Sequence, residues 1–219
     1  MLSGSRNVGL IFIVILLAGF SSSTAAASKV TISSSPQILS SGDIFTVDVF
    51  VEPDVAIAGM QFSLEFDESK LNVVEVTEGD LFRQSGLGTF FNNGTVGQGM
   101  LTNVYGTILG ASNVSTPAAF ASIILVVEPQ EEFTSTLNLK NVIISDPDGN
   151  AVVVEVMDAI IEVMSIYDVN GDGAVDLTDY GIIDEHFSET TSFPYPRWDV
   201  NSDGIVNVQD LRLITFNLG

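Results

Sequence analysis

The sequence predicts a mainly β protein in two parts, an antiparallel β-sandwich followed by a short helical unit. Segments in which apolar and polar residues alternate recur between residues 29 and 164, and turns rich in glycine, asparagine and proline separate them. Nearer the C-terminus an acidic pattern occurs twice, and apolar residues at helical spacing follow each copy. No amphipathic helix of ordinary length is recognisable between the β segments, which favours strands that follow one another directly in an antiparallel sandwich.

The clearest strand patterns are Thr46–Glu52 (TVDVFVE) and Phe62–Phe66 (FSLEF), in which apolar side chains fall on every second position. About eight or nine short strands at such spacing are typical of an antiparallel sandwich. Further strands are expected at residues 71–76, 100–109, 120–128, 136–144 and 151–163. The inner faces are expected to bury Phe50, Phe62, Leu64, Phe66, Leu125 and Val127.

The N-terminus has the pattern of an export signal. Arg6 supplies a positive charge, Val8–Phe20 form an apolar run, and Ala25–Ala27 offer small residues for cleavage. We expect residues 1–27 to be a signal peptide, with an uncleaved membrane anchor as the alternative, and the protein to be secreted or held at the cell surface. Since the chain has no cysteine, its stability must come from core burial and bound metal.

The charge balance excludes two classes of partner. Seven lysines and arginines stand against 28 acidic residues, which gives a formal net charge of −21. Nucleic acid and anionic membrane surfaces would repel such a chain.

The acidic pattern is DVNGDGAVDLTD at Asp168–Asp179 and DVNSDGIVNVQD at Asp199–Asp210, 31 positions later. Oxygen-bearing side chains occupy positions 1, 3, 5, 9 and 12, and glycine occupies position 6, which is the ligand spacing of a calcium loop. Solvated acidic turns are the alternative, but they do not explain two copies in register. Two calcium ions are therefore expected on Asp168, Asn170, Asp172, Ala174, Asp176 and Asp179, and on Asp199, Asn201, Asp203, Ile205, Asn207 and Asp210.

Each loop is expected to have a helix after it and none before it. Pro194 and Pro196 oppose a helix entering the second loop. A unit of roughly 50 residues has a marginal core, so calcium should supply much of its folding free energy. The helices are expected to pack through Tyr180, Ile183 and Phe187 and through Leu211, Ile214 and Leu218.

Two stretches carry family resemblances. Ile57–Leu71 (IAGMQFSLEFDESKL) and Thr77–Leu81 (TEGDL) resemble a cohesin, and the repeat resembles a dockerin of type I. The resemblance implies a nine-stranded jelly-roll sandwich at residues 28–164 and a dockerin domain with two F-hand loops at 165–219. Cohesins are not enzymes: they bind dockerins, which attach proteins to assemblies such as cellulosomes that degrade polysaccharides.

The resemblance also suggests where partners bind, although this chain departs from the best-known members at those positions. On the tail, Leu177, Val208 and the acidic pair Asp184 and Glu185 depart from the hydroxyl and basic residues that are usual in dockerins. On the sandwich, Gly59 and Gln61 stand where cohesins often have asparagine and aspartate. Packing at the helix starts and a merely solvated strand face remain the alternatives. The candidate contact residues are Gln61 and Ser63 on the sandwich, and Leu177, Thr178, Val208 and Gln209 at the helix starts.

Enzyme chemistry has little support in the sequence. His186 is the only histidine, and there is no cysteine, nucleophile elbow or phosphate-binding loop. Paired carboxylates could serve a glycoside hydrolase, but no sugar cleft is evident. A carbohydrate-binding module needs exposed aromatic residues, and the candidates are Phe90, Phe91, Tyr105 and Trp198, of which Phe90 and Phe91 are predicted as core and hairpin residues.

The sequence thus predicts an exported, non-catalytic scaffolding protein with dockerin-bearing and cohesin-bearing partners. A carbohydrate-binding sandwich with a dockerin tail is the alternative function. Head-to-tail self-association stays open, because the chain resembles both members of the pair. The first loop should bind calcium more tightly, since it offers four carboxylates against three.

Overall fold

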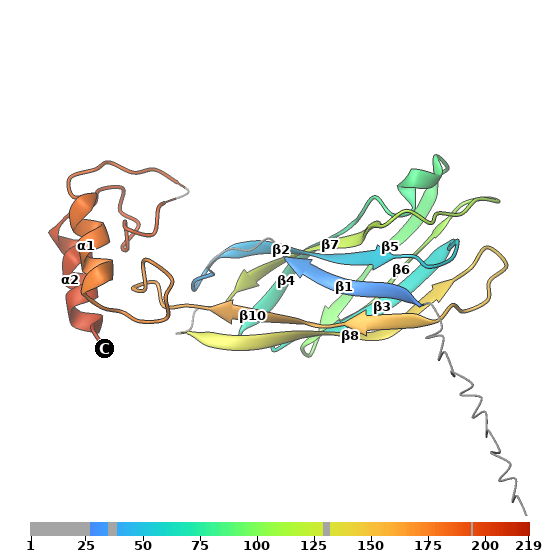
Figure 1. Ribbon diagram of the computed structural model, residues 1–219, viewed down its shortest axis with the longest axis horizontal. Coiled ribbons are helices and arrows are strands. Elements are labelled where there is room, and N and C mark those ends of the chain that lie inside the picture. The colour runs from blue at the N-terminus through green and yellow to red at the C-terminus, as the bar shows by residue number, and fades with distance from the viewer. Residues whose placement is uncertain (1–26, 35–38, 129–131, 194) are drawn as a thin grey trace, which may run out of the picture.

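The computed structural model describes residues 27–34, 39–128, 132–193 and 195–219 (Figure 1). Nearly all of the signal segment expected at 1–27 lies outside the described residues. Within them, no helix is both long and apolar enough to span a bilayer. The strands are β1 (Ser28–Ser34), β2 (Ile44–Glu52), β3 (Gly59–Glu65), β4 (Leu71–Glu78), β5 (Thr89–Gly97), β6 (Met100–Ile108), β7 (Ala118–Val127), β8 (Phe133–Ser145), β9 (Val154–Met157) and β10 (Ala159–Val163), with a 3₁₀ turn, η1 (Arg83–Ser85), before β5.

The strands form two five-stranded sheets, which confirms the predicted sandwich. One sheet has the order β4-β7-β2-β1-β9 and the other β10-β8-β3-β6-β5. All pairs are antiparallel except β1 with β9, which run parallel. Figure 1 shows the sandwich as an elongated body with the C-terminal helices beyond one end.

The core between the sheets is built from one alternate face of each strand. Phe62, Leu64, Phe66, Leu125 and Val127 are buried there as expected. The prediction for Phe50 was wrong. Phe45, Val47, Val49 and Val51 form the inner face of β2, which leaves Phe50 half-buried on the outer face beside Thr46 and Asp48.

The predicted strand at 151–163 is two strands in different sheets. β9 pairs with β1, and β10 pairs with β8 in the opposite sheet. Between them, the carboxylate of Asp158 accepts a hydrogen bond of 2.8 Å from the amide of Leu139. Alternation alone does not mark such a crossover, and β1 and β5 were not among the strands expected from the sequence.

The C-terminal unit has one helix after each acidic loop, α1 (Leu177–Glu185) and α2 (Val208–Asn217), and no helix occurs among the described residues between them. Ile183, Leu211 and Ile214 pack with Val169 and Val206 in a small second core, against which Tyr180 is partly buried. Phe187 and Leu218 were also expected in this core, but they lie beyond the helix ends, outside the core, and are 47% and 41% exposed.

Truncation of Phe120 should destabilise the sandwich strongly. Its ring is 1% exposed and makes edge contacts with Phe62, Phe82 and Phe91, so we expect Phe120→Ala to cost about 3–5 kcal/mol. The matched variant Phe50→Ala removes a half-buried ring from the outer face and should cost far less. Urea unfolding followed by far-ultraviolet circular dichroism measures both losses, and equal losses would contradict the assignment of faces.

Candidate calcium loops and recognition surfaces

The first acidic loop is organised around Asp168, whose carboxylate is 2% exposed. One carboxylate oxygen accepts the amides of Gly171 and Asp172 at 2.9 and 3.2 Å, and the other accepts the amide of Gly173 at 2.9 Å. These bonds wind the backbone around one carboxylate. Position 1 of the predicted loop is therefore its structural centre.

Asp179 closes the same loop from the first turn of α1. Its two oxygens accept the amides of Asn170 and Asp176 at 3.1 and 2.8 Å. The carboxylate of Asp176 in turn accepts the amide of Thr178, so Asp176 and Asp179 form a capping box. These hydrogen bonds lower the pKa of Asp176, that from Thr178 having the largest effect. Positions 9 and 12 thus start the helix and close the loop.

The second loop repeats this arrangement. Asp199 accepts the amides of Asp203 and Gly204 at 3.2 and 3.1 Å. Asp210, at position 12, accepts the amides of Asn201 and Asn207 at 3.2 and 2.8 Å. The sequence repeat is therefore also a repeat of hydrogen bonds.

Glycine at position 6 is required by the backbone. Gly173 and Gly204 have φ angles of +90° and +89°, in the left-handed region where a Cβ is strained. The space beside Gly173 is open, so a substitution there would be resisted by conformation and not by crowding.

The remaining predicted ligand residues lie toward the outside of the loops. The side-chain amides of Asn170 and Asn201 donate hydrogen bonds to the carboxylates of Asp172 and Asp203 at 2.8 and 2.9 Å. Ala174 and Ile205, at position 7, are exposed, as is Asp176. No three acidic, histidine or cysteine side chains converge on one point within the described residues. The donor set at each loop therefore mixes carboxylates with amide and carbonyl oxygens.

This donor set fits a calcium ion. Asp168, Asp179, Asp199 and Asp210 are at most 2% exposed, and burying a carboxylate costs several kcal/mol unless its charge is offset. Each carboxylate oxygen has two lone pairs. Each oxygen of Asp179 and of Asp210 accepts one hydrogen bond from a backbone amide and so keeps one lone pair for a metal ion. Hard oxygen donors of this kind are those that calcium prefers. When bound, the ion supplies positive charge against these carboxylates.

The four predicted contact residues at the helix starts are all exposed. Leu177 and Val208, which open α1 and α2, are 73% and 57% exposed, and Thr178 and Gln209 beside them also face solvent. Packing within the small core is therefore not their role. Leu177 and Val208 form two exposed apolar side chains at equivalent places in the repeat.

On the sandwich, Gln61 and Ser63 have different environments. Gln61 is exposed, whereas Ser63 is 6% exposed, so the expectation that both lie on the solvated face was wrong for Ser63. The register of β3 shifts between Gln61 and Leu64 against both neighbouring strands. A bulge of this kind moves the following residue out of the alternation.

Gln61 lies in an apolar patch that sequence reasoning missed. It pairs with Tyr105 on β6 and Ile143 on β8, and the ring of Phe90 on β5 lies 5.9 Å from that of Tyr105. Phe90 and Tyr105 are 47% and 43% exposed, so the prediction of a core role was wrong for Phe90, which lies on the outer face of the β5–β6 hairpin. Phe91 does pack on the core, against Phe120. We call Gln61, Phe90, Tyr105 and Ile143 the sheet patch.

The single histidine has a structural environment. The ring of His186 stacks on Trp198 at 3.9 Å, and its Nδ1 lies 3.0 Å from the carboxylate of Glu189. Trp198 is partly buried against the second core. Trp198 is therefore no open platform for a sugar.

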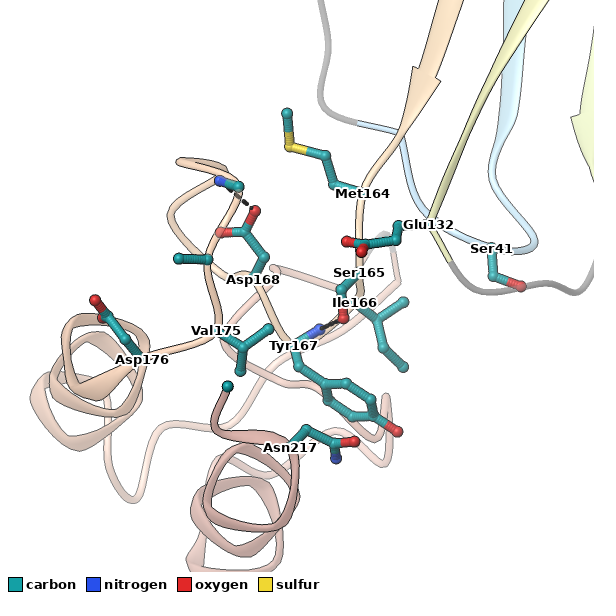
Figure 2. A pocket seen from close by; sticks show the side chains of 13 residues that line it. Ser41, Glu132, Met164, Ser165, Ile166, Tyr167, Asp168, Val175, Asp176 and Asn217 are labelled. Carbon is teal, nitrogen blue, oxygen red and sulfur yellow. Dashed lines mark hydrogen bonds between the residues drawn. The ribbon is translucent and has the colours of Figure 1, made fainter.

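A pocket of about 1040 Å³ lies where the sandwich meets the C-terminal unit (Figure 2). Ser41 and Glu132 border it from the sandwich, and the first loop and the end of the chain border it from the other side. The connecting residues Met164–Tyr167 run along it. The two parts of the chain are therefore close neighbours along this connection.

Comparisons with known proteins support the assignment of both the sandwich and the C-terminal unit. Residues 28–163 match the model of the cohesin domain, and residues 166–218 match that of the dockerin type I domain. A search of curated protein sequences gave no match. The chain therefore belongs to the cohesin family, with a dockerin type I domain after the sandwich, as the sequence predicted.

Solved structures show the same sandwich fold. A non-cellulosomal cohesin from the archaeon Archaeoglobus fulgidus is 19% identical with a TM-score of 0.51, over 64% of this chain and 93% of that one. The cohesin of a type I cohesin–dockerin complex from Clostridium thermocellum is 19% identical with a TM-score of 0.52, over 64% and 100%. Cohesins and dockerins are interaction modules without catalytic activity, and type I dockerins typically bind calcium.

The two loops should differ in calcium affinity because of one charge. Exchanging position 9 through Asp176→Asn and Asn207→Asp should weaken the first loop and strengthen the second, each on the order of tenfold. Asp and Asn cap helices equally well, so α1 and α2 should be unaffected. Isothermal titration with calcium measures both sites. Equal wild-type affinities that do not respond to the exchange would refute the charge argument.

Proposed function

We propose that this chain is an exported, non-catalytic adaptor that mediates calcium-dependent assembly between cohesins and dockerins. Its sandwich receives dockerin-bearing partners, and its tail docks on cohesin-bearing partners. The observation that carries the proposal is that one chain has a cohesin and a dockerin, and that each has an apolar surface open to solvent.

The sheet patch is the proposed docking surface of the sandwich. Its side chains lie on the outer face of three neighbouring strands, β8, β3 and β6, with Phe90 added from β5. Large apolar side chains gathered on one face are typical of protein interaction sites. Gln61 at its centre supplies hydrogen-bonding groups, whereas the buried Ser63 is not accessible to a partner.

The helix starts are the proposed docking surface of the tail. Leu177 and Val208 would enter the partner, and Thr178 and Gln209 would bond with its polar groups. The two copies differ further along their helices. Asp184 and Glu185 make the end of α1 acidic, whereas on α2 the guanidinium of Arg212 lies over the ring of Phe216 at 5.5 Å. A partner would therefore meet different charges at the two ends.

Calcium dependence follows from the size of the tail. Among the described residues of the tail, five buried apolar side chains form its core, which is small for a domain that must fold alone. Two bound calcium ions would offset the buried carboxylates at Asp168, Asp179, Asp199 and Asp210 and join folding to metal binding. Chelation should then remove the docking surface of the tail.

Export is proposed from the N-terminal segment and the composition. Residues 1–27 have the pattern of a signal peptide, an uncleaved anchor being the alternative, and the chain has no cysteine to oxidise outside the cell. A strongly acidic chain also stays soluble by repulsion. We place the protein in the extracellular space or at the cell surface.

Carbohydrate binding by the sandwich is a second candidate, favoured by the rings of Phe90 and Tyr105. They lie side by side on one face at an interplanar angle of 34°, and both are partly open to solvent. The rings present two flat apolar surfaces on which a sugar could stack. The two functions would use the same patch.

Capture experiments with the full chain distinguish these functions. Immobilised wild type, exposed to the secreted proteins of the source organism, should retain cohesin-bearing proteins in calcium but not in chelator. Leu177→Asp with Val208→Asp should reduce that capture at least roughly tenfold, because a carboxylate would be buried in the interface. The double variant should keep dockerin-bearing proteins, which Ile143→Asp should lose.

The outcomes separate the alternatives. Glu75→Gln, on the other sheet, is the control for Ile143→Asp and should change nothing. Retention of the chain on an insoluble polysaccharide, abolished by Phe90→Ala with Tyr105→Ala, would favour the carbohydrate function. Capture of a soluble copy of the chain itself would establish head-to-tail self-association. Equal capture by all variants would refute both docking surfaces.

A further inference from the structure

One contact joins the sandwich to the C-terminal unit and lies outside both docking surfaces. Arg197 precedes the second calcium loop by two residues, yet its Nη1 donates a hydrogen bond of 2.7 Å to the hydroxyl of Ser40 in the sandwich. The two residues are 157 positions apart in the chain. Ser40 is itself buried, in the turn that leads into β2.

The same guanidinium holds the first calcium loop and the connecting segment. Nη2 donates to the carbonyl oxygens of Ser165 and Asp168, and Nε donates to that of Val169 at 3.3 Å. Arg197 thus bonds with the sandwich, the connection and position 1 of the first loop at once. The planar fork of arginine suits it for several acceptors, where the compact ammonium of lysine would not reach them all.

The start of the connection is also fixed to the sandwich. The amide of Met164 donates to the carbonyl of Leu39 at 2.8 Å, and Leu39 pairs with Val163 as an isolated parallel bridge. Only Ser165–Tyr167 remain before the first calcium loop, and Arg197 bonds with the carbonyl of Ser165. No flexible linker separates the two modules.

The charge of Arg197 suits this position. Burial lowers its pKa, while the carboxylates of Asp168, Asp43 and Asp179 oppose that change. Asp43 belongs to the same turn as Ser40, whose amide donates to the Asp43 carboxylate at 2.8 Å. The guanidinium therefore lies between acidic groups of both modules.

The calcium loops decide whether Arg197 can hold this position. The turn that carries it closes when the amide of Asp199, position 1 of the second loop, donates to the carbonyl of Pro196 at 3.0 Å. Its acceptors on the other side are the carbonyls of Asp168 and Val169 in the first loop. If the loops need calcium to fold, these donors and acceptors are brought together only in the loaded tail.

We propose that Arg197 fixes the tail on the end of the sandwich at one orientation, and that calcium controls this intramolecular interface. Its dependence on calcium rests on the proposed function, whereas the contact itself does not. The consequence is a set angle between the sheet patch and the helix starts. An adaptor of this kind would place its two partners in a defined relative position in calcium, and would not do so without it.

Distances between spin labels in the full chain test this proposal. The chain has no cysteine, so Glu75→Cys on β4 and Glu185→Cys at the end of α1 give two unique exposed labelling sites, one in each module. In calcium, the wild-type background should give one narrow distance distribution. Chelation, or Arg197→Ala in calcium, should abolish the narrow peak.

Further variants keep the test decisive if Arg197→Ala impairs the folding of the tail. Ser40→Ala removes the acceptor on the sandwich side and leaves the residues of the tail intact. It should therefore lose the narrow peak while the helix content in saturating calcium stays unchanged. Arg212→Ala removes the other arginine of the tail and should keep the peak. A narrow peak that persists in both Arg197→Ala and Ser40→Ala, or in chelator, would overturn the proposal. The distance measurement does not involve a partner. A failure of the capture experiments would therefore count against the proposed function and not against the Arg197 contact.

Discussion

The folded tail depends on four buried carboxylates, one at each end of the two acidic loops. Asp168 and Asp199 gather the loop amides, and Asp179 and Asp210 close the loops from the helix starts. Hydrogen bonds from backbone amides occupy some of the acceptor sites of each carboxylate, but they do not cancel its negative charge. Residues 165–219 contain no lysine and only two arginines, Arg197 and Arg212. We therefore infer that bound calcium supplies the remaining positive charge that balances these carboxylates.

The two proposed docking surfaces depend on this constraint to different degrees. The sheet patch is supported by a sandwich with its own large core, and it needs no metal. The helix starts at Leu177 and Val208 are positioned by the capping boxes that Asp179 and Asp210 complete. Calcium would then govern the tail as a docking element and, through Arg197, its placement, while the sandwich keeps its shape. Partners could in this way be bound at one surface and released at the other.

The local features could be predicted from sequence because their chemistry is local. The oxygen-bearing positions, the glycine at position 6 and the start of the following helix all lie within twelve positions, and the repeat fixes their register. The sandwich followed from strand alternation and from the family resemblance. Phe50 was misplaced because β2 carries apolar side chains on both faces, and Ser63 because a bulge in β3 shifts the alternation by one residue. The exposure of Phe90 and the contacts of Arg197 depend on neighbours distant in the chain, which no local pattern records.

Hydrogen exchange of the full chain, followed by mass spectrometry with and without calcium, tests the central claim that the metal holds the tail folded. The account predicts that amides of residues 168–217, including those that donate to the four buried carboxylates, are protected in calcium and exchange rapidly in chelator. Amides of β2, β3 and β7 should exchange equally slowly in both conditions. Equal protection of α1 and α2 with and without calcium would contradict the claim.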